Sequence, residues 1–148
     1  MLATHTPSFT ILIAEDDDGH AELVVEQLQN AGVSCPFRRF RDGQEVLDLL
    51  LPADGEPGWD RESPCLVLLD INMPRVDGLT VLRRLKGDPA TRGIPVIMLT
   101  TTDDPGEVAA CYGLGCNLYL TKPVEFEAFA ETLHRLGQLL QVLKVVRS

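Results

Sequence analysis

The sequence predicts an α/β fold, a doubly wound parallel sheet with helices on both faces. Short runs that are apolar throughout recur along the chain, and each of them ends in polar residues. Such runs are typical of parallel strands that are buried on both faces, whereas a half-exposed strand alternates. Segments with apolar residues at helical spacing lie between the runs, and this regular alternation of strand and helix indicates a parallel sheet.

Five strands are expected from these runs. Four are strongly apolar and cover residues 9–14, 65–69, 95–99 and 117–120. A weaker fifth candidate covers residues 35–40, where Phe37 and Phe40 flank two arginines. Because charged side chains favour solvent, we expect this fifth strand near an edge of the sheet.

Five helices are expected between and after the strands. Glycine or proline marks the end of the first three, at Gly32, Pro52 and Gly87. A short fourth helix follows Pro105, and the longest helix covers about residues 125–146. The alternation of elements is therefore complete from the first strand to the last helix.

Length, composition and charge limit the function. The 148 residues fit one domain, and 45% of them are apolar, which suffices for one hydrophobic core. The 22 acidic and 13 basic side chains give a formal charge of −9. This charge argues against binding to nucleic acid or to an anionic membrane. Residues 52–64 hold four acids, three prolines and two glycines, which indicates an inserted surface loop.

Nothing in the sequence indicates export or membrane insertion. The four cysteines form neither a CxxC pair nor a zinc-ligand spacing. The first residues lack the positive charge and apolar stretch of a secretory signal. No apolar run approaches the roughly 18 residues of a membrane span. We therefore expect a soluble, cytoplasmic protein.

Residues able to do chemistry follow the ends of the expected strands. Asp16, Asp70, Thr100 and Lys122 each stand close after an apolar run. Ligands of open α/β sheets bind at the carboxyl ends of the strands. The spacing between these residues fits whole strand–helix–strand steps, so we expect them to converge on one patch.

This combination suggests a phosphoryl site with a metal ion. Asp16, Asp17 and Asp70 would be close carboxylates, whose repulsion a hard cation such as Mg²⁺ relieves. Thr100 offers a hydroxyl and Lys122 a positive charge to phosphoryl oxygens. Each residue also has an ordinary explanation, such as a helix cap, a turn cap, strand propensity or a solvated lysine. Their joint position at one sheet edge favours the site, with the phosphoryl group on Asp70.

The sequence resembles the receiver domains of two-component response regulators. The segments that carry the resemblance are, in order, ILIAEDD, LVLLDINMPRVDG, PVIMLTTT and YLTKP. The resemblance covers about residues 9–136 and implies a flavodoxin-like, five-stranded doubly wound sheet. Residues 1–148 would then be a single receiver domain, with a core at 9–136 and an extension of the C-terminal helix at 137–148.

The resemblance implies a role for each acidic residue of the patch. Asp70 would be the phosphoacceptor. Asp16, Asp70 and the backbone carbonyl of Asn72 would bind Mg²⁺, and Glu15 would act on the metal through water.

It also implies how the phosphoryl group is held and sensed. Thr100 and Lys122 would bind the phosphoryl oxygens. Thr100 would then turn toward the phosphoryl group and Tyr119 would swing inward, which forms the switch. The bond between Lys122 and Pro123 is often cis in such domains.

Closer segments resemble the stand-alone regulators of bacterial phytochrome kinases. These segments are IPVIMLTTTDD, the loop at 52–64 and CNLYLTKPVEFEAF. The resemblance implies a sensor histidine kinase, of the bacterial phytochrome class, as partner. It implies no enzyme activity beyond self-phosphotransfer and self-dephosphorylation. Because no output domain follows the matching region, we expect the signal to pass by protein contact.

The last helix predicts a homodimer. One seam contains Phe126, Phe129, Leu133, Leu136, Leu140 and Leu143, and a second apolar set contains Leu139, Val142, Val145 and Val146. One small sheet can cover only one face of a helix. We therefore expect a dimer interface that contains Leu136, Leu139, Leu140, Val142, Leu143 and Val146. The alternative is a tail folded back on its own subunit.

Three other functions compete with this interpretation. A phosphatase of the haloacid dehalogenase type uses similar residues, but in the reverse order and with a general acid where this chain has Asn72. A flavodoxin-like electron carrier needs a phosphate loop where this chain has EDDDGH. A degenerate receiver would lack part of the site. His5, His20 and His134 show no acid–base arrangement, and the sequence assigns them no role.

Overall fold

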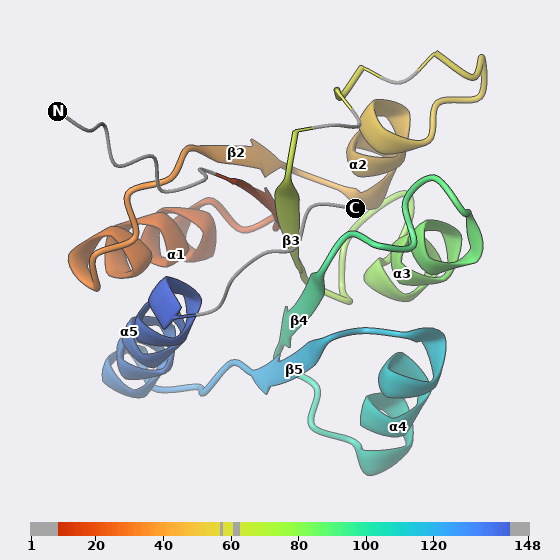
Figure 1. Ribbon diagram of the computed structural model, residues 1–148. Coiled ribbons are helices and arrows are strands. Elements are labelled where there is room, and N and C mark those ends of the chain that lie inside the picture. Colours follow the sequence, from red (N-terminus) through yellow and green to blue (C-terminus); the bar gives the residue numbers. More distant parts are fainter. Residues whose placement is uncertain (1–8, 57, 61–62, 143–148) are drawn as a thin grey trace, which may run out of the picture.

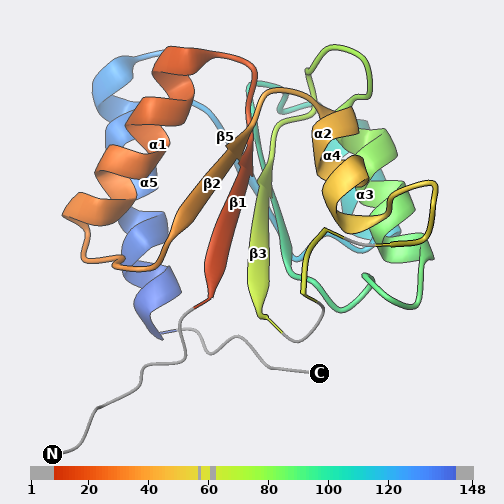
Figure 2. The same ribbon diagram turned by 90° about the horizontal axis from the view of Figure 1, so that it is seen from above.

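Five parallel strands form one sheet in the order β2-β1-β3-β4-β5. The computed structural model describes residues 9–56, 58–60 and 63–142. The strands are β1 (Thr10–Ala14), β2 (Phe37–Phe40), β3 (Cys65–Leu69), β4 (Val96–Thr100) and β5 (Leu118–Thr121). The helices are α1 (Asp18–Asn30), α2 (Gly43–Leu50), α3 (Gly78–Gly87), α4 (Pro105–Leu114) and α5 (Phe126–Val142). Helices α1 and α5 cover one face of the sheet, and α2, α3 and α4 cover the other (Figure 1 and Figure 2).

The predicted fold class is confirmed. Each strand lies within two residues of its predicted bounds, and β2, the strand with two arginines, is an edge strand. Four helices begin with an aspartate whose carboxylate accepts a backbone N–H of the first turn: Asp17, Asp42, Asp77 and Asp104. These caps satisfy N–H groups that a helix start leaves without partners.

The core has two layers because successive strand residues point to opposite faces of the sheet. Leu12, Val67 and Met98 pack on the side of α2, α3 and α4. Their neighbours, such as Ile11 and Leu68, pack on the side of α1 and α5. Both layers are apolar, which explains why the strands show no alternation in the sequence.

Helix α5 packs more closely on its own subunit than the sequence predicts. Leu136 and Leu140 belong to the core beside α1, so these two residues of the expected dimer interface are not free for a partner. Gly137 allows this close approach, because a Cβ there would overlap Ala31 at the end of α1. Gln141 donates a hydrogen bond to the Ala31 carbonyl.

The remainder of α5 leaves a smaller apolar surface. Leu139 is 40% exposed. Leu143 and Val146 lie outside the described residues, as does the side chain of Val142. No described helix, α5 included, is long and apolar enough to span a membrane.

The register of the sheet aligns the strand ends on which the predicted site depends. Ala14 pairs with Leu69, and the N–H of Asp70 donates to the Ala14 carbonyl at 3.1 Å. At the other side of the sheet, Thr100 pairs with Thr121. The residues after β1, β3 and β5 therefore emerge at one edge. The edge includes the gap between β1 and β3, where the direction of strand order reverses.

Gly78 brings the start of α3 against the end of β3. A Cβ at this position would overlap the backbone oxygen of Asp70 and the Cα of Ile71. Backbone atoms there cannot move without shifting Asp70. The absence of a side chain at residue 78 therefore helps to place the predicted phosphoacceptor.

We predict that Gly78→Ala lowers the free energy of unfolding by at least about 2 kcal/mol, because overpacked backbone must shift. Gly113→Ala is the matched control, since a Cβ there meets nothing in α4. The control is expected to stabilise the protein by about 0.5–1 kcal/mol through helix propensity. Urea unfolding of both variants measures the difference. Equal effects of the two substitutions would contradict the close-approach account.

Candidate functional site

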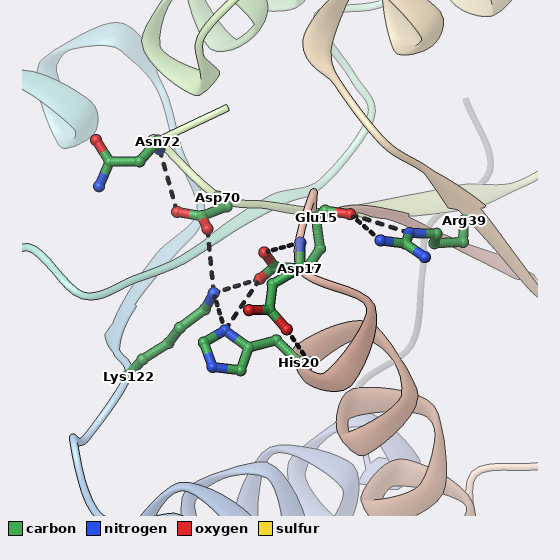
Figure 3. Close-up of polar contacts among 7 residues, drawn as sticks. All are labelled: Glu15, Asp17, His20, Arg39, Asp70, Asn72 and Lys122. Carbon is green, nitrogen blue, oxygen red and sulfur yellow. Dashed lines mark hydrogen bonds and ion pairs between the residues drawn. The ribbon is translucent and has the colours of Figure 1, made fainter. Parts of the chain in front are cut away.

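Lys122 lies at the centre of the polar groups at the carboxyl edge of the sheet. Its side chain is buried, with the whole residue 4% exposed. Its Nζ donates to Asp70 Oδ2 at 3.1 Å and to Glu15 Oε1 (Figure 3). Of the residues whose spacing predicts one patch, Asp70 and Lys122 are in contact, and Asp16 lies close to Asp70. The described residues contain no cis peptide bond, so the Lys122–Pro123 bond is trans.

Three carboxylates surround the same point. Ligand oxygens of Glu15, Asp16 and Asp70 lie within 4.8 Å of one another. Glu15 and Asp70 are buried, whereas Asp16 is exposed. Burial raises the pKa of Glu15, and the hydrogen bond from Lys122 opposes this rise. Asp16 makes no hydrogen bond or ion pair with any residue that the structure describes, which leaves its carboxylate available to a ligand.

Asp17 does not join this group, contrary to the prediction of a carboxylate cluster that includes it. Its carboxylate caps α1 by accepting the N–H of His20 at 2.9 Å. This hydrogen bond lowers the pKa of Asp17. The simpler explanation that the sequence offered for this residue, a helix cap, is therefore the observed one.

Arg39 in β2 forms hydrogen bonds to the acidic loop after β1, and the sequence analysis did not predict this contact. Its Nε and Nη2 donate to the backbone oxygen of Glu15 at 3.0 and 2.8 Å (Figure 3). Its Nη1 donates to Asp18 at 2.6 Å, and Arg41 donates to the same carboxylate oxygen at 2.7 Å. These two cations lower the pKa of Asp18. The two arginines of the edge strand are Arg38 and Arg39, and their presence in an acidic protein is a signal that could have found this contact; Arg41 follows the strand.

The formal charges at this edge leave room for a divalent cation. Residues 15–18 and Asp70 carry five carboxylates, and three cations contact them: Arg39, Arg41 and Lys122. The excess is two negative charges. Carboxylate oxygens are ligands that a hard cation prefers, and three carboxylates gather here. The acidic pocket is therefore consistent with a divalent metal site.

Thr100 presents a buried hydroxyl without a partner. The residue is fully buried, and its Oγ1 makes no hydrogen bond to the residues that the structure describes. The backbone oxygen of Thr100 accepts the N–H of Lys122 at 2.7 Å, which ties both residues to one edge. Buried hydroxyls are normally paired. This one is available to a ligand that enters the site.

The loop that follows β3 donates a hydrogen bond to the carboxylate of Asp70. The N–H of Asn72 donates to Asp70 Oδ1 at 3.2 Å, and Lys122 occupies the other oxygen (Figure 3). The Asp70 carboxylate is therefore oriented on both sides. The Asp70 side chain is 9% exposed.

Tyr119 connects β5 to the loop after β4. Its hydroxyl donates to the Thr102 carbonyl at 2.6 Å, and its N–H donates to the hydroxyl oxygen of Tyr112 at 3.0 Å. Burial raises the pKa of Tyr119 to about 12, so the phenol keeps its proton at neutral pH. The predicted switch residue is thus held by hydrogen bonds to the loop before α4, at Thr102, and to the last turn of α4, at Tyr112.

His20, to which the sequence assigned no role, also contacts the site lysine. Its Nδ1 lies 3.2 Å from Lys122 Nζ and 3.9 Å from Glu15 Oε1. The sequence placed His20 at a helix start without a role. Its contact with the Lys122 side chain, which crosses the end of the sheet from β5, brings it to the site.

Comparison with known proteins gives one family. Residues 11–134 match the response regulator receiver domain family. The crystal structure of a response regulator receiver domain from Rhodospirillum rubrum aligns with a TM-score of 0.89 and 41% identity. The alignment covers 94% of this chain and 98% of that one.

Two further relatives are the response regulators Rcp1 and RcpA. Response regulator Rcp1 of Synechocystis is 37% identical over 116 residues, 78% of each protein. The Mn²⁺-bound form of Rcp1 aligns with a TM-score of 0.82 at 30% identity, over 93% of this chain and 99% of that one. The phosphorylated cyanobacterial phytochrome response regulator RcpA aligns with a TM-score of 0.79 at 27% identity, over 93% and 98%. These matches give no support to a phosphatase.

We predict that a divalent cation stabilises the protein through Asp16. At ten times its dissociation constant, Mg²⁺ adds about 1.4 kcal/mol to the free energy of unfolding and raises Tm by about 3–6 °C. Asp16→Asn is expected to lose most of this rise. Glu26→Gln, an equal charge change on the exposed side of α1, is expected to keep it. Differential scanning calorimetry with Mg²⁺ and with EDTA measures it, and an equal rise in both variants would contradict the assignment.

We predict that Thr100→Val changes the free energy of unfolding by less than about 1 kcal/mol, because the lost hydroxyl has no partner. Thr91→Val is the matched control. Thr91 is also fully buried, but its hydroxyl donates to the Leu85 carbonyl at 2.7 Å. That substitution is expected to cost about 1–3 kcal/mol. A larger loss at position 100 than at position 91, measured by urea unfolding, would show that Thr100 has a structural partner after all.

Proposed function

The chain belongs to the response regulator receiver domain family, and on that premise we propose that Asp70 accepts a phosphoryl group from a sensor histidine kinase. The observation that carries the proposal is the contact of 3.1 Å between Lys122 Nζ and Asp70 Oδ2 in a buried pocket. The buried carboxylate supplies the nucleophile, and the buried lysine beside it supplies a positive charge for the incoming group.

The step is the transfer of a phosphoryl group from nitrogen to oxygen. A carboxylate oxygen of Asp70 attacks the phosphorus of the kinase's phosphohistidine, and a P–O bond forms as the P–N bond breaks. The electron pair of the broken bond stays on the imidazole, which takes up a proton. Because phosphoryl transfer involves little covalent work by the protein, positioning and charge carry the catalysis.

Two side chains of this chain hold the transferred group. Lys122 exchanges its hydrogen bond to Asp70 for one to a phosphoryl oxygen. The Thr100 hydroxyl, which has no described partner, donates to another. Both donors are buried, where such charge-assisted hydrogen bonds are stronger than in water.

We assign a Mg²⁺ site to Asp16, Asp70 and the backbone carbonyl of Asn72, with Glu15 acting through water. The excess of two negative charges and the free Asp16 carboxylate support this assignment. The Mn²⁺-bound form of Rcp1 shows that a relative binds a divalent metal. When bound, Mg²⁺ supplies positive charge that offsets the repulsion between the carboxylates and the phosphoryl oxygens.

Thr100 and Tyr119 form the proposed switch. When Thr100 turns toward the phosphoryl group, it vacates volume beneath the loop that begins α4. Tyr119 then releases the Thr102 carbonyl and moves inward. The exchange couples new hydrogen bonds at the site to a repacked surface at α4 and β5, where partners of the active form bind.

The proposed partners follow from the family and the surface. A sensor histidine kinase of the bacterial phytochrome class supplies the phosphoryl group. The likeness to RcpA, a cyanobacterial phytochrome response regulator, and to AtBRR, a bacteriophytochrome response regulator, supports this class. A second copy of the chain binds through the exposed part of α5 around Leu139, together with Val142, Leu143 and Val146. The chain signals in the cytoplasm by protein contact, with no catalysis beyond self-phosphotransfer and self-dephosphorylation.

We predict that incubation with acetyl phosphate and Mg²⁺ adds one phosphoryl group to the protein, measured as intact mass. Asp70→Asn is expected to gain none, because an amide is not a nucleophile for phosphorus. Asp77→Asn, an exposed aspartate that caps α3, is the control and is expected to be phosphorylated like wild type. Modification of Asp70→Asn to the extent of wild type would exclude Asp70 as acceptor.

A further inference from the structure

The Lys122 ammonium contacts a third hydrogen-bond partner in addition to the carboxylates of Glu15 and Asp70. A lysine ammonium has three N–H donors and no acceptor. Three acceptors surround Nζ: Glu15 Oε1, Asp70 Oδ2 at 3.1 Å and His20 Nδ1 at 3.2 Å (Figure 3). Because Nζ can only donate, Nδ1 of His20 must accept, which places the ring hydrogen on Nε2. All three donors of this buried ammonium are then satisfied.

The His20 ring is itself held in place by α5. It packs against the ring of Phe129 in a T-shaped arrangement, with ring centroids 5.5 Å apart and planes at 79°. Lys122 Nζ lies 6.0 Å from the same aromatic ring. The backbone N–H of His20 donates to Asp17 at the start of α1, which fixes the turn that carries the ring. His20 therefore joins α1, α5 and the site lysine at one point.

We propose that His20 is a positioning residue that fixes the Lys122 ammonium for phosphoryl transfer. The inference rests on the proposed function of the same site. During transfer, Lys122 gives up Asp70 Oδ2 for a phosphoryl oxygen, while its bonds to Glu15 and His20 stay. Those two bonds then define where the positive charge stands. Without His20, Glu15 alone holds the ammonium, which is free to rotate away from the phosphoryl group.

Three substitutions separate the hydrogen bond from the packing. His20→Phe keeps an aromatic ring against Phe129 but removes the acceptor and excludes water from its place. His20→Asn keeps an acceptor near the position of Nδ1 and gives up the ring. His20→Ala removes both, but opens space in which water can accept the hydrogen bond, because the His20 side chain is already 41% exposed.

The rate of phosphorylation by acetyl phosphate at saturating Mg²⁺ distinguishes these variants. We expect His20→Phe to be slowed about tenfold, as loss of a hydrogen bond to a charged group implies, and His20→Ala by less. His20→Asn is expected to recover to within about twofold of wild type. His134→Phe, which changes a half-buried histidine elsewhere on α5, is the control and is expected to match wild type. A structural role alone would rank the variants by packing, with Phe nearest to wild type, and this order would overturn the inference.

A second measurement tests the contact without any phosphorylation. Long-range ¹H–¹⁵N correlation of the His20 ring at pH 8 is expected to show an unprotonated Nδ1, whose resonance shifts in Lys122→Met. A protonated Nδ1, or no shift, overturns the inference. Because the ring spectrum does not depend on the phosphoryl group, it tests the contact between His20 and Lys122 even if acetyl phosphate fails to modify the protein. Failure of the wild type to gain mass therefore contradicts the proposed function, whereas the ring spectrum decides the role of His20.

Discussion

The site depends on one buried ammonium shared between carboxylates that would otherwise repel each other. Lys122 donates to both Glu15 and Asp70, and its burial excludes the water that would weaken these interactions. The Lys122 side chain therefore has little conformational freedom. The backbone hydrogen bond from Lys122 to Thr100 and the contact with the His20 ring fix its position. A charge held in this way can stabilise a phosphoryl group without first reorganising, which is the main route by which proteins assist such transfers.

The fold supplies this arrangement through sheet register and close backbone packing. Parallel pairing of β1 with β3 and of β4 with β5 sets the strand ends level, so that short loops carry the polar groups to one edge. Gly78 lets α3 approach the end of β3, and Arg39 holds the acidic loop from the neighbouring edge strand. These contacts are made to backbone atoms of Asp70 and Glu15 and not to their carboxylates. They nevertheless decide where the carboxylates stand.

Much of this could be predicted from the sequence, because a parallel sheet turns local patterns into global positions. Apolar runs that end in Asp70 and Lys122 imply one shared edge once the strand order is doubly wound. Contacts between side chains of different packed elements leave no such pattern in the sequence. His20 is one residue in the first turn of α1, and no pattern in the sequence predicts its contact with the Lys122 side chain. Leu136 and Leu140 have the same spacing whether they face a sheet or a partner, so the sequence assigned them to an interface that the core already uses.

The most direct test of the central claim is a crystal structure of the protein with Mg²⁺ and beryllofluoride, an analogue of the phosphoryl group. The account predicts the analogue on a carboxylate oxygen of Asp70, with Lys122 Nζ and Thr100 Oγ1 each within hydrogen-bond distance of a fluorine, at about 2.7–3.2 Å. It also predicts that Lys122 keeps its contact with Glu15. An analogue bound to a different residue, or a Lys122 ammonium turned away from it, would contradict the account.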